Sequence, residues 1–181
     1  MARIAWLSFA MRVLAWSSSL TQEKADEKAK SLGLPAGAVQ VVGSKEEAIE
    51  RADVLSLHYV LSPRSRGIIG KAELEKMKST AVLINTSRGP LADEAALLEA
   101  LKKGKIRGAA LDVFETEPLP QDSEWRTVKW GEEGRSEVVL SPHMGYGEEG
   151  TMDAWYNEQA NILGKWLNGE EVGPKLGGYS A

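Results

Sequence analysis

AVLINTSRGP, residues 81–90, joins an apolar run to a polar turn. The apolar run, Ala81 to Ile84, is bounded by turn residues and is typical of a buried parallel strand. A helix-like segment over residues 93–103 follows the turn. Arg88 is therefore expected at the carboxyl edge of a sheet, where open α/β folds bind ligands. Its guanidinium offers a planar fork of donors that suits a carboxylate.

Strand-like and helix-like segments alternate on both sides of this stretch. We expect strands over residues 12–16, 39–42, 53–59, 81–85, 106–113 and 137–140. We expect helices over residues 2–10, 22–32, 44–51, 71–78, 94–103 and 151–168. The alternation predicts an α/β fold with a mostly parallel sheet, flanking helices and right-handed crossovers. Residues 114–135 are expected to form a long irregular segment.

Several helix ends carry recognisable local signals. Thr21, Ser44 and Asp93 are predicted to cap the helices that follow them, because their side chains can accept from free backbone N–H groups. Gly33 and Gly104 are placed just after helices, where glycine commonly ends them.

Composition excludes several classes of function. The 181 residues fit one domain of ordinary size, and 43% hydrophobic with 27% charged residues is a globular balance. A net charge of -4 argues against a nucleic-acid partner. The absence of cysteine excludes disulfides and thiolate metal sites, and two histidines, His58 and His143, make a metal site unexpected. No stretch reaches the roughly 18–20 apolar residues of a membrane span, so no membrane partner is expected.

The first 22 residues allow two interpretations. They contain Arg3, Arg12 and several serines but no acidic residue, which loosely resembles an organelle transit peptide. The favoured interpretation is a structural helix followed by a strand. A cytoplasmic protein is therefore expected, with a mitochondrial one as the alternative.

Ionisable residues follow three of the predicted strands. Arg88, Glu117 and His143 each come after such a strand, and Asp112 ends the strand before Glu117. If the strands are parallel neighbours, these residues lie on one edge of the sheet. An arginine can hold an anion and polarise a carbonyl, and a histidine beside a carboxylate can transfer a proton. Alternatively, the three are a surface ion pair, a solvated charge and a turn cap.

Four segments carry a family resemblance. They are VLSLH at 54–58, INTSRG at 84–89, ALDVFETEP at 110–118 and SPHMGY at 141–146. With these motifs in this order, the chain resembles the D-isomer-specific 2-hydroxyacid dehydrogenase family, in its NAD(P)-binding domain. The intervals of 29 residues from Arg88 to Glu117 and 26 from Glu117 to His143 also suit the family.

The resemblance implies catalytic roles for three residues. Arg88 would bind the substrate carboxylate and carbonyl, and His143 would act as acid or base on the C2 oxygen. Glu117 would pair with His143 and keep it protonated during reduction of a 2-oxo acid. His58 would be structural or near the cofactor.

The resemblance also implies a cofactor site for NAD or NADP. Its expected residues are Ser17, Val60, Thr86, Ser87, Asp112 and Gly145. NAD-dependent relatives usually carry an acidic residue where this chain has Ser17, and a hydroxyl does not repel a 2′-phosphate. However, no Lys or Arg follows Ser17 until Lys24, so the sequence leaves the choice of cofactor open.

The chain is expected to lack one family feature, the Gly-rich turn that holds the pyrophosphate. Members carry a Gly-x-Gly-x-x-Gly turn after their first, central strand, whereas residues 1–10 here resemble the helix that follows that turn. We therefore expect an N-terminally truncated domain in which the flanking strands either close the gap or leave two open inner edges. Open edges invite pairing with other chains, so the polypeptide alone is predicted to fold poorly or to associate.

The chain is predicted to have two parts and an oxidoreductase function. Residues 1–150 would form an incomplete dinucleotide-binding domain, and residues 151–181 a helix and tail that pack on a substrate domain. The expected function is NAD(P)-dependent oxidoreduction at the CH–OH group of small 2-hydroxy acids, as a homodimer in the full-length family. The alternative is a non-catalytic interaction module or co-repressor-like regulator that responds to nucleotide.

Overall fold

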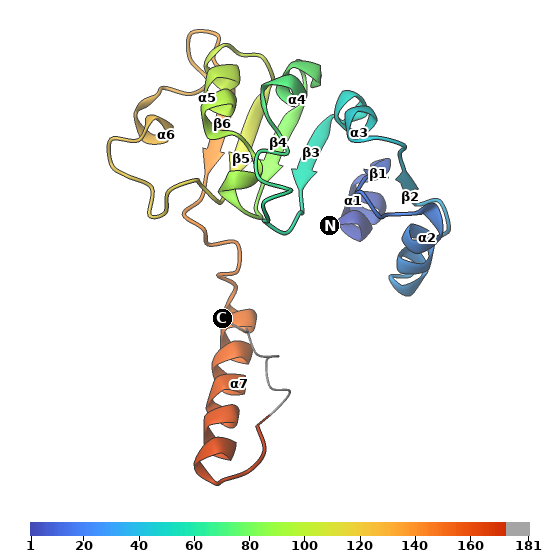
Figure 1. Cartoon of the computed structure of the whole chain (residues 1–181), viewed down its shortest axis with the longest axis vertical. Helices are drawn as coiled ribbons and strands as arrows, with labels where there is room; N and C mark the ends of the chain where they lie inside the picture. The colour runs from blue at the N-terminus through green and yellow to red at the C-terminus, as the bar shows by residue number, and fades with distance from the viewer. Residues whose placement is uncertain (173–181) are drawn as a thin grey trace. The chain divides into compact units, whose positions relative to one another are not determined.

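The computed structural model describes residues 1–172 and divides into two compact units, Met1–Pro142 and His143–Ala181. The first unit contains parallel strands, which are β1 (Val13–Ala15), β2 (Val39–Val41), β3 (Val54–Leu57), β4 (Val82–Asn85), β5 (Gly108–Leu111) and β6 (Glu137–Leu140). Its helices are α1 (Ala2–Phe9), α2 (Gln22–Ser31), α3 (Lys45–Arg51), α4 (Lys71–Lys76), the 3-10 turn η1 (Gly89–Leu91), α5 (Glu94–Lys102) and α6 (Glu124–Thr127). The second unit contains α7 (Glu149–Leu167). The predicted α/β fold with parallel strands and flanking helices is confirmed (Figure 1).

The predicted helix caps are present. The Thr21 side chain accepts from the N–H of Lys24, and the Asp93 side chain accepts from that of Ala96. The Ser44 side chain accepts from the N–H of Glu47 at 3.0 Å. The Glu47 carboxylate in turn accepts from the N–H of Gly43, the residue before the cap. Local side-chain chemistry therefore fixes where these helices begin.

Most strands and helices are one to a few residues shorter than predicted, for example β3 and β5. Two other differences have identifiable causes. Residues 114–135 are not wholly irregular, because α6 forms within them around the buried Trp125. The final helix begins at Glu149 instead of Thr151, since the Glu148 side chain accepts from the N–H groups of Gly150 and Thr151. Both differences arise from interactions that hydrophobic periodicity does not report.

The strands form two sheets, and within residues 1–172 no ladder joins them. One has the order β1-β2 and the other the order β3-β4-β5-β6 (Figure 1). The doubly wound order 3-2-1-4-5-6 with its strand 1 removed gives this arrangement. Of the two alternatives left open by the sequence, closure of the gap and two open inner edges, the structure has the second.

The hydrogen-bond pattern identifies which backbone groups lie on the open edges. The carbonyl of Ala15 accepts from the N–H of Val42, so the backbone groups of Ala15 face β2. Because successive residues of a strand direct their N–H and C=O groups to opposite sides, those of Leu14 face away from β2. In the same way, the carbonyl of Asp53 accepts from the N–H of Val82 and faces β4. The N–H and C=O groups of Val54 and Ser56 therefore face away from β4. These groups point to the open sides of β1 and β3.

The main core lies on one face of the four-stranded sheet. Leu83 and Leu111 pack there against residues of α4 and α5, including Leu74 and Leu101. On the opposite face Val139 is 68% exposed. Parallel sheets are normally covered on both faces. In this structure one face of the larger sheet therefore supplies most of the apolar burial.

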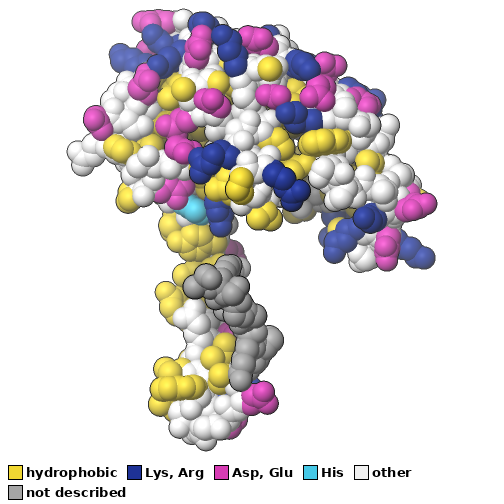
Figure 2. All heavy atoms as spheres, in the orientation of Figure 1, with side chains coloured by type: hydrophobic (Ala, Val, Ile, Leu, Met, Phe, Trp, Pro, Cys, Tyr) yellow, Lys and Arg dark blue, Asp and Glu magenta, His cyan; other side chains and the backbone are white. Residues whose placement is uncertain are grey.

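The second unit is a single long helix with its preceding loop. α7 has no buried residue, and its aromatic side chains Trp155, Tyr156 and Trp166 are 45%, 64% and 64% exposed. Figure 2 shows hydrophobic side chains along this helix. The predicted C-terminal tail falls mostly on residues 173–181, which lie outside the described part of the chain. Within residues 1–172, no helix has both the length and the apolarity needed to cross a bilayer.

One partly buried ion pair joins α3 to α4. The Lys45 Nζ donates to Glu73 Oε1 at 2.7 Å, and the N–H of Gly70 donates to Glu73 Oε2 at 2.9 Å. Burial raises the pKa of Glu73, but the hydrogen bonds from Lys45 and Gly70 outweigh it and leave the pKa below its usual value. The ionised form is therefore favoured by folding.

Exchange of amide hydrogens should reveal the open edges. We expect the N–H groups of Leu14, Val54 and Ser56 to exchange much faster than those of Leu83 and Ile84, whose strand has a hydrogen-bonded neighbour on both sides. Residue-resolved hydrogen exchange measured by NMR provides the comparison. Equal protection on β3 and β4 would show that β3 has a partner strand in solution.

The Glu73→Gln substitution should remove acid-dependent stability. Because folding lowers the pKa of Glu73, its contribution is present above the unfolded value of about 4.3 and is lost as pH falls through the folded value. We expect the free energy of unfolding to drop by about 1.5 kcal/mol at pH 7 and by progressively less below pH 4. Urea unfolding at several pH values measures this. Glu99→Gln, in an exposed pair with Lys103, is the control and should leave the free energy of unfolding nearly unchanged at every pH, because solvent screens the pair.

Candidate functional site at the carboxyl edge

The loop after β4 is held by a buried amide. Asn85 is 1% exposed, its Nδ2 donates to the carbonyl of Arg88 at 2.9 Å, and its Oδ1 accepts from the N–H of Ser87 at 3.1 Å. Both ends of one side chain therefore bond to the turn that carries Arg88. The turn is fixed in shape before any ligand arrives.

Contacts link the carboxyl ends of neighbouring strands. The hydroxyl of Ser87 donates to the carbonyl of Tyr59 at 2.8 Å, which joins the loops after β4 and β3. The ring of Tyr59 stacks on Trp16 at the end of β1, with centroids 6.2 Å apart. The N–H of Asp112 donates to the carbonyl of Asn85 at 3.0 Å, which continues the edge to β5. The ends of β1, β3, β4 and β5 thus form one connected edge.

Gly89 lets two of these loops approach very closely. A Cβ placed on it would lie 2.1 Å from both the carbonyl carbon and the oxygen of Phe114, and 2.7 Å from the nitrogen of Glu115. These are backbone atoms, which cannot swing aside as a flexible side chain can. The loop carrying Arg88 is therefore pressed against the loop carrying Glu117 because residue 89 has no side chain.

Arg88 differs from the surface ion pair stated as its alternative, whereas Glu117 is exposed, as a solvated charge would be. Arg88 is exposed, its Nη1 donates to the carbonyl of Ser87 at 2.6 Å, and it makes no ion pair within residues 1–172. The Glu117 Oε1 accepts from the N–H of Phe114 at 2.9 Å, so its carboxylate is anchored to its own loop. The structure thus presents an arginine without a carboxylate ion pair beside a loop with an oriented carboxylate.

The third predicted catalytic residue belongs to the second unit. His143 has a positive φ of 57°, and its ring meets that of Tyr146 edge-on with centroids 6.5 Å apart. Tyr146 stacks in turn on Trp155 of α7 at 6.1 Å. Gly145 lies in the same loop. The predicted triad is thus divided between the two units, with Arg88 and Glu117 in the first.

The cofactor residues predicted in the first unit all lie along the connected edge. Ser17 follows β1, Val60 follows β3, Thr86 and Ser87 follow β4, and Asp112 follows β5. Val60 is 85% exposed, in a loop shaped by the buried Ser65, whose hydroxyl donates to the Val60 carbonyl at 2.7 Å. Asp112 is 6% exposed. Exposed small and hydroxyl side chains with an apolar loop tip suit an extended nucleotide lying across strand ends.

A glycine pattern does occur elsewhere in the chain. Residues 145–150, GYGEEG, have the Gly-x-Gly-x-x-Gly spacing and open helix α7. However, the Glu148 carboxylate accepts from the N–H of Gly150 at 3.0 Å and from that of Thr151 at 2.7 Å. The hydroxyl and N–H of Thr151 and the N–H of Gly150 lower the pKa of Glu148, which keeps it charged. A phosphate would find these donors occupied and a negative charge in its place, so this pattern is not a pyrophosphate cradle.

Two structural contributors were not assigned a role from the sequence. Asn85 and Gly89 flank the turn with Arg88, and both are needed for its shape. The sequence signal that could have identified both residues is an asparagine at the last position of the strand and a glycine directly after the arginine.

Gly89→Ala should disturb the site. The added methyl group would meet the backbone of Phe114, so the two loops must separate, at a cost of about 1–3 kcal/mol. Thermal or urea unfolding measures the stability, and NMR shifts of residues 85–89 and 114–117 report the displacement. Gly43→Ala is a matched control, because a Cβ there meets the Glu47 carboxylate at an ordinary 3.6 Å. Equal stability and unchanged shifts in Gly89→Ala would contradict the close approach.

Comparison with known proteins gives concordant matches. The chain is 38% identical to D-3-phosphoglycerate dehydrogenase of Methanocaldococcus jannaschii over 163 residues, which cover 90% of this chain and 28% of that protein. It is 44% identical to glyoxylate/hydroxypyruvate reductase B of an Enterobacter species over 123 residues, covering 68% of this chain and 35% of the relative. The crystal structure of phosphoglycerate oxidoreductase from Vibrio cholerae superposes with a TM-score of 0.72 at 30% identity, covering 92% of this chain and 49% of that one.

These relatives are longer than the present chain, which spans less than half of the length of each. The family model described as D-isomer specific 2-hydroxyacid dehydrogenase, NAD binding domain, matches residues 1–145. That match covers both sheets and the loops with Arg88, Glu117 and His143. The chain belongs to the D-isomer specific 2-hydroxyacid dehydrogenase family, through its NAD-binding domain.

Proposed function

We propose that this chain supplies the nucleotide-binding part of an NAD(P)-dependent oxidoreductase that interconverts small 2-hydroxy acids and 2-oxo acids. The observation that carries the proposal is the loop after β4. It holds an exposed arginine, without an ion pair among residues 1–172, at the carboxyl edge of a parallel sheet. Planar guanidinium donors at such an edge suit a substrate that has a carboxylate next to a carbonyl.

The proposed roles follow from the chemistry of each side chain. Arg88 binds the carboxylate and polarises the C2 carbonyl of the oxo acid. His143 gives a proton to the C2 oxygen in reduction and takes it back in oxidation. Glu117 pairs with His143 and favours its protonated form. The nicotinamide, when bound, supplies or accepts the hydride at C2.

The proposed cofactor contacts follow the connected edge. Ser17 lies at the adenosine end, and Val60, Thr86 and Ser87 lie along the nucleotide. Asp112, together with Gly145 of the second unit, is proposed for the nicotinamide end. Support comes from the exposure of Val60 and from the links between the loops after β1, β3, β4 and β5.

The remaining features of the proposal concern the whole protein. Residues 1–150 would act as the dinucleotide-binding domain, and residues 151–181 would pack on a substrate domain, for which the exposed aromatic residues of α7 are suited. A homodimer in the cytoplasm is the proposed state of the full-length protein. The competing function is a non-catalytic regulator that responds to nucleotide. Such a regulator would bind nucleotide at the same site but would not turn over a substrate.

Turnover with nucleotide and oxo acid tests the proposal. Mixed with NADH or NADPH and with glyoxylate, hydroxypyruvate or pyruvate, the protein should oxidise the nucleotide, followed by absorbance at 340 nm. Arg88→Lys should lower kcat/KM by about 100-fold, because a point charge replaces the planar fork. His143→Gln should lower kcat by about 100-fold or more with little change in KM.

The control is Arg51→Ala, which removes an exposed arginine of α3 paired with Glu47. It should leave kcat and KM unchanged. Nucleotide binding, followed by fluorescence titration, separates the two functions. Binding without turnover would favour the regulator, and neither binding nor turnover in the folded chain would contradict both.

A further inference from the structure

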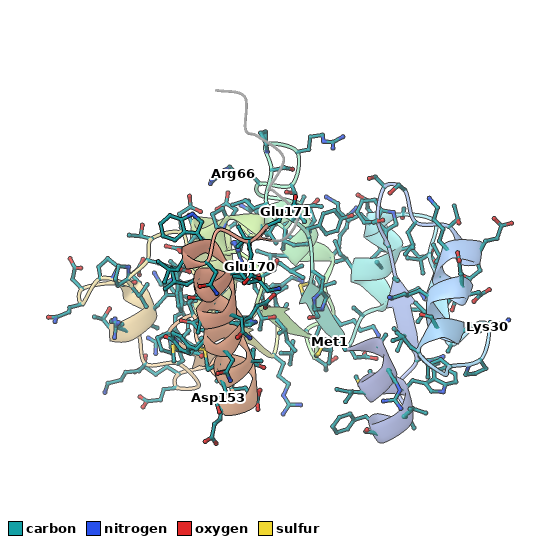
Figure 3. All side chains as sticks on the ribbon, turned by 90° about the horizontal axis from the view of Figure 1, so that it is seen from below. Met1, Lys30, Arg66, Asp153, Glu170 and Glu171 are labelled. Atoms are coloured by element: carbon teal, nitrogen blue, oxygen red, sulfur yellow. The ribbon has the colours of Figure 1, made fainter. Side chains whose placement is uncertain are left out.

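The open edges of β1 and β3 face each other. At the carboxyl ends of the two strands, the ring of Trp16 stacks on that of Tyr59, with centroids 6.2 Å apart. At their amino ends, a hydrogen bond from Lys78 lowers the pKa of the Asp53 carboxyl, and the charge of Arg12 lowers it further, so Arg12 lies near Asp53. Both ribbon views place the smaller sheet, in blue, beside β3 and away from β6 (Figure 1 and Figure 3). The two strands are therefore aligned and run in the same direction.

The backbone groups on these facing edges do not pair with each other. Leu14 of β1 and Val54 and Ser56 of β3 each direct an N–H and a C=O to the open side. Within residues 1–172, no backbone group reaches across to them. Neighbouring strands of a sheet lie about 4.8 Å apart, and two parallel edges at that spacing form a ladder. The absence of a ladder indicates that β1 and β3 lie farther apart than directly paired strands.

The side chains beside these edges are apolar and incompletely covered. Val54 is 42% exposed, and Val13, Leu14 and Leu55 are only partly buried. Parallel strands that are covered on both faces are normally rich in Val, Ile and Leu along their whole length. The surroundings of the space between β1 and β3 therefore suit a strand with apolar side chains on both of its faces.

The pattern of partial charges indicates what kind of group this space accepts. Each open edge presents N–H donors and C=O acceptors, and an extended chain carries the complementary groups at the same spacing. A helix directs its own backbone groups along its axis, so it cannot pair with either edge. One extended chain can satisfy both edges at once, because successive residues direct their groups to opposite sides.

We propose that the space between β1 and β3 binds one extended, apolar strand of a partner polypeptide. The strand inserts parallel to both neighbours and joins the two sheets into one. Because β1 has three residues and β3 has four, an insert of about four or five residues spans both edges. Its backbone groups bond to Leu14 on one side and to Val54 and Ser56 on the other. Backbone pairing of this kind provides affinity, and the side chains on the two faces provide specificity.

A second copy of the chain fits this space less well. Every strand described in residues 1–172 already has a hydrogen-bonded neighbour, so none is free to insert. Two copies related by a two-fold axis would instead bring like edges together in an antiparallel pair. Such a pair satisfies one edge of each copy and leaves the other edge open. The inserted strand is therefore assigned to a different polypeptide.

Peptide binding tests the proposal. The probe is a synthetic peptide with about five consecutive Val and Ile residues between lysines, blocked at both ends. Added to the full chain, it should slow amide exchange at Leu14, Val54 and Ser56 by about 10-fold or more, because both edges gain partners. The N–H of Val138 faces the outer side of β6 and should exchange as before. A peptide of the same sequence with alternate N-methylated residues lacks donors for one edge and should not bind.

A proline substitution assigns the binding to the edge of β3. Ser56→Pro removes an N–H that faces β1 and breaks no bond to β4, so it should weaken peptide binding, measured by calorimetry, by about 10-fold or more. Val138→Pro is the matched control, because it removes an N–H from the outer edge of β6, and it should leave binding unchanged. Circular dichroism checks that each variant is folded. If Ser56→Pro does not fold, the N-methylated peptide provides the same test from the side of the ligand.

A spin label on the peptide determines its direction. Attached to the carboxyl end, the label should broaden the NMR signals of Trp16 and Tyr59. Attached to the amino end, it should broaden those of Arg12 and Asp53. This result is expected only for a strand that lies parallel to β1 and β3.

The outcomes decide between insertion and other kinds of pairing. Protection of both edges in the parallel direction supports the proposal. Protection of one edge alone, an antiparallel direction or no protection would overturn it. Protection of both edges without peptide, in a chain that sediments as a dimer, would also overturn it, because a second copy would then be the occupant. These outcomes are independent of the proposed function, since no nucleotide is present.

Discussion

The approach of Gly89 to the backbone of Phe114 sets the geometry on which the candidate site depends. An ordinary side chain at residue 89 would collide with atoms that cannot rotate away. Without that approach, the loops after β4 and β5 would separate, and Arg88 would no longer lie beside the loop with Glu117. The constraint is one of volume: Gly89 is not in a positive-φ conformation, so its missing side chain matters more than its conformational freedom.

The buried side chain of Asn85 adds a second constraint to the same turn. Burying an amide costs free energy unless its groups find partners, and both polar atoms of Asn85 have one. Those partners are backbone groups of residues 87 and 88, so the polar side chain organises the loop that carries Arg88. A leucine at this place would fill similar space in the core without shaping the turn. The choice of asparagine is therefore explained by the site more than by the stability of the sheet.

Much of the fold could be predicted from the sequence because its signals are local. The caps at Thr21, Ser44 and Asp93 are decided within a few residues, and the alternation of strands and helices is carried by periodicity. The separation of β1 from β3 could not be decided in this way, since strand pairing depends on groups far apart in the chain. The short helix α6 was missed because it depends on the burial of Trp125 against the main core.

The candidate site stays a prediction, and the structure describes the surroundings of its residues. The spacing of the motifs led to the hypothesis that Arg88, Glu117 and His143 form one site. The structure shows the contacts that each side chain makes within its own unit. Lys24 shows the limit of sequence intervals, because its Nζ donates to the carbonyl of Ser19 although the sequence separates the two residues. The GYGEEG segment has the glycine spacing of a phosphate-binding loop but cannot serve as one. The Glu148 carboxylate within it already accepts from the N–H groups of Gly150 and Thr151.

The two sheets bear differently on the proposed nucleotide site. The larger sheet has the main core behind it, whereas α1, α2 and the segment before β2 share a separate small cluster of Ala29, Leu34 and Ala38 with Trp6. In the described part of the chain no ladder connects the sheets, and the stacking of Trp16 on Tyr59 is a contact that spans them. The adenosine end of the proposed site lies on the smaller sheet, and the residues that would meet the rest of the nucleotide lie on the larger. A ligand that contacts both stabilises their arrangement by its binding free energy, so nucleotide binding and the ordering of the two sheets are thermodynamically linked.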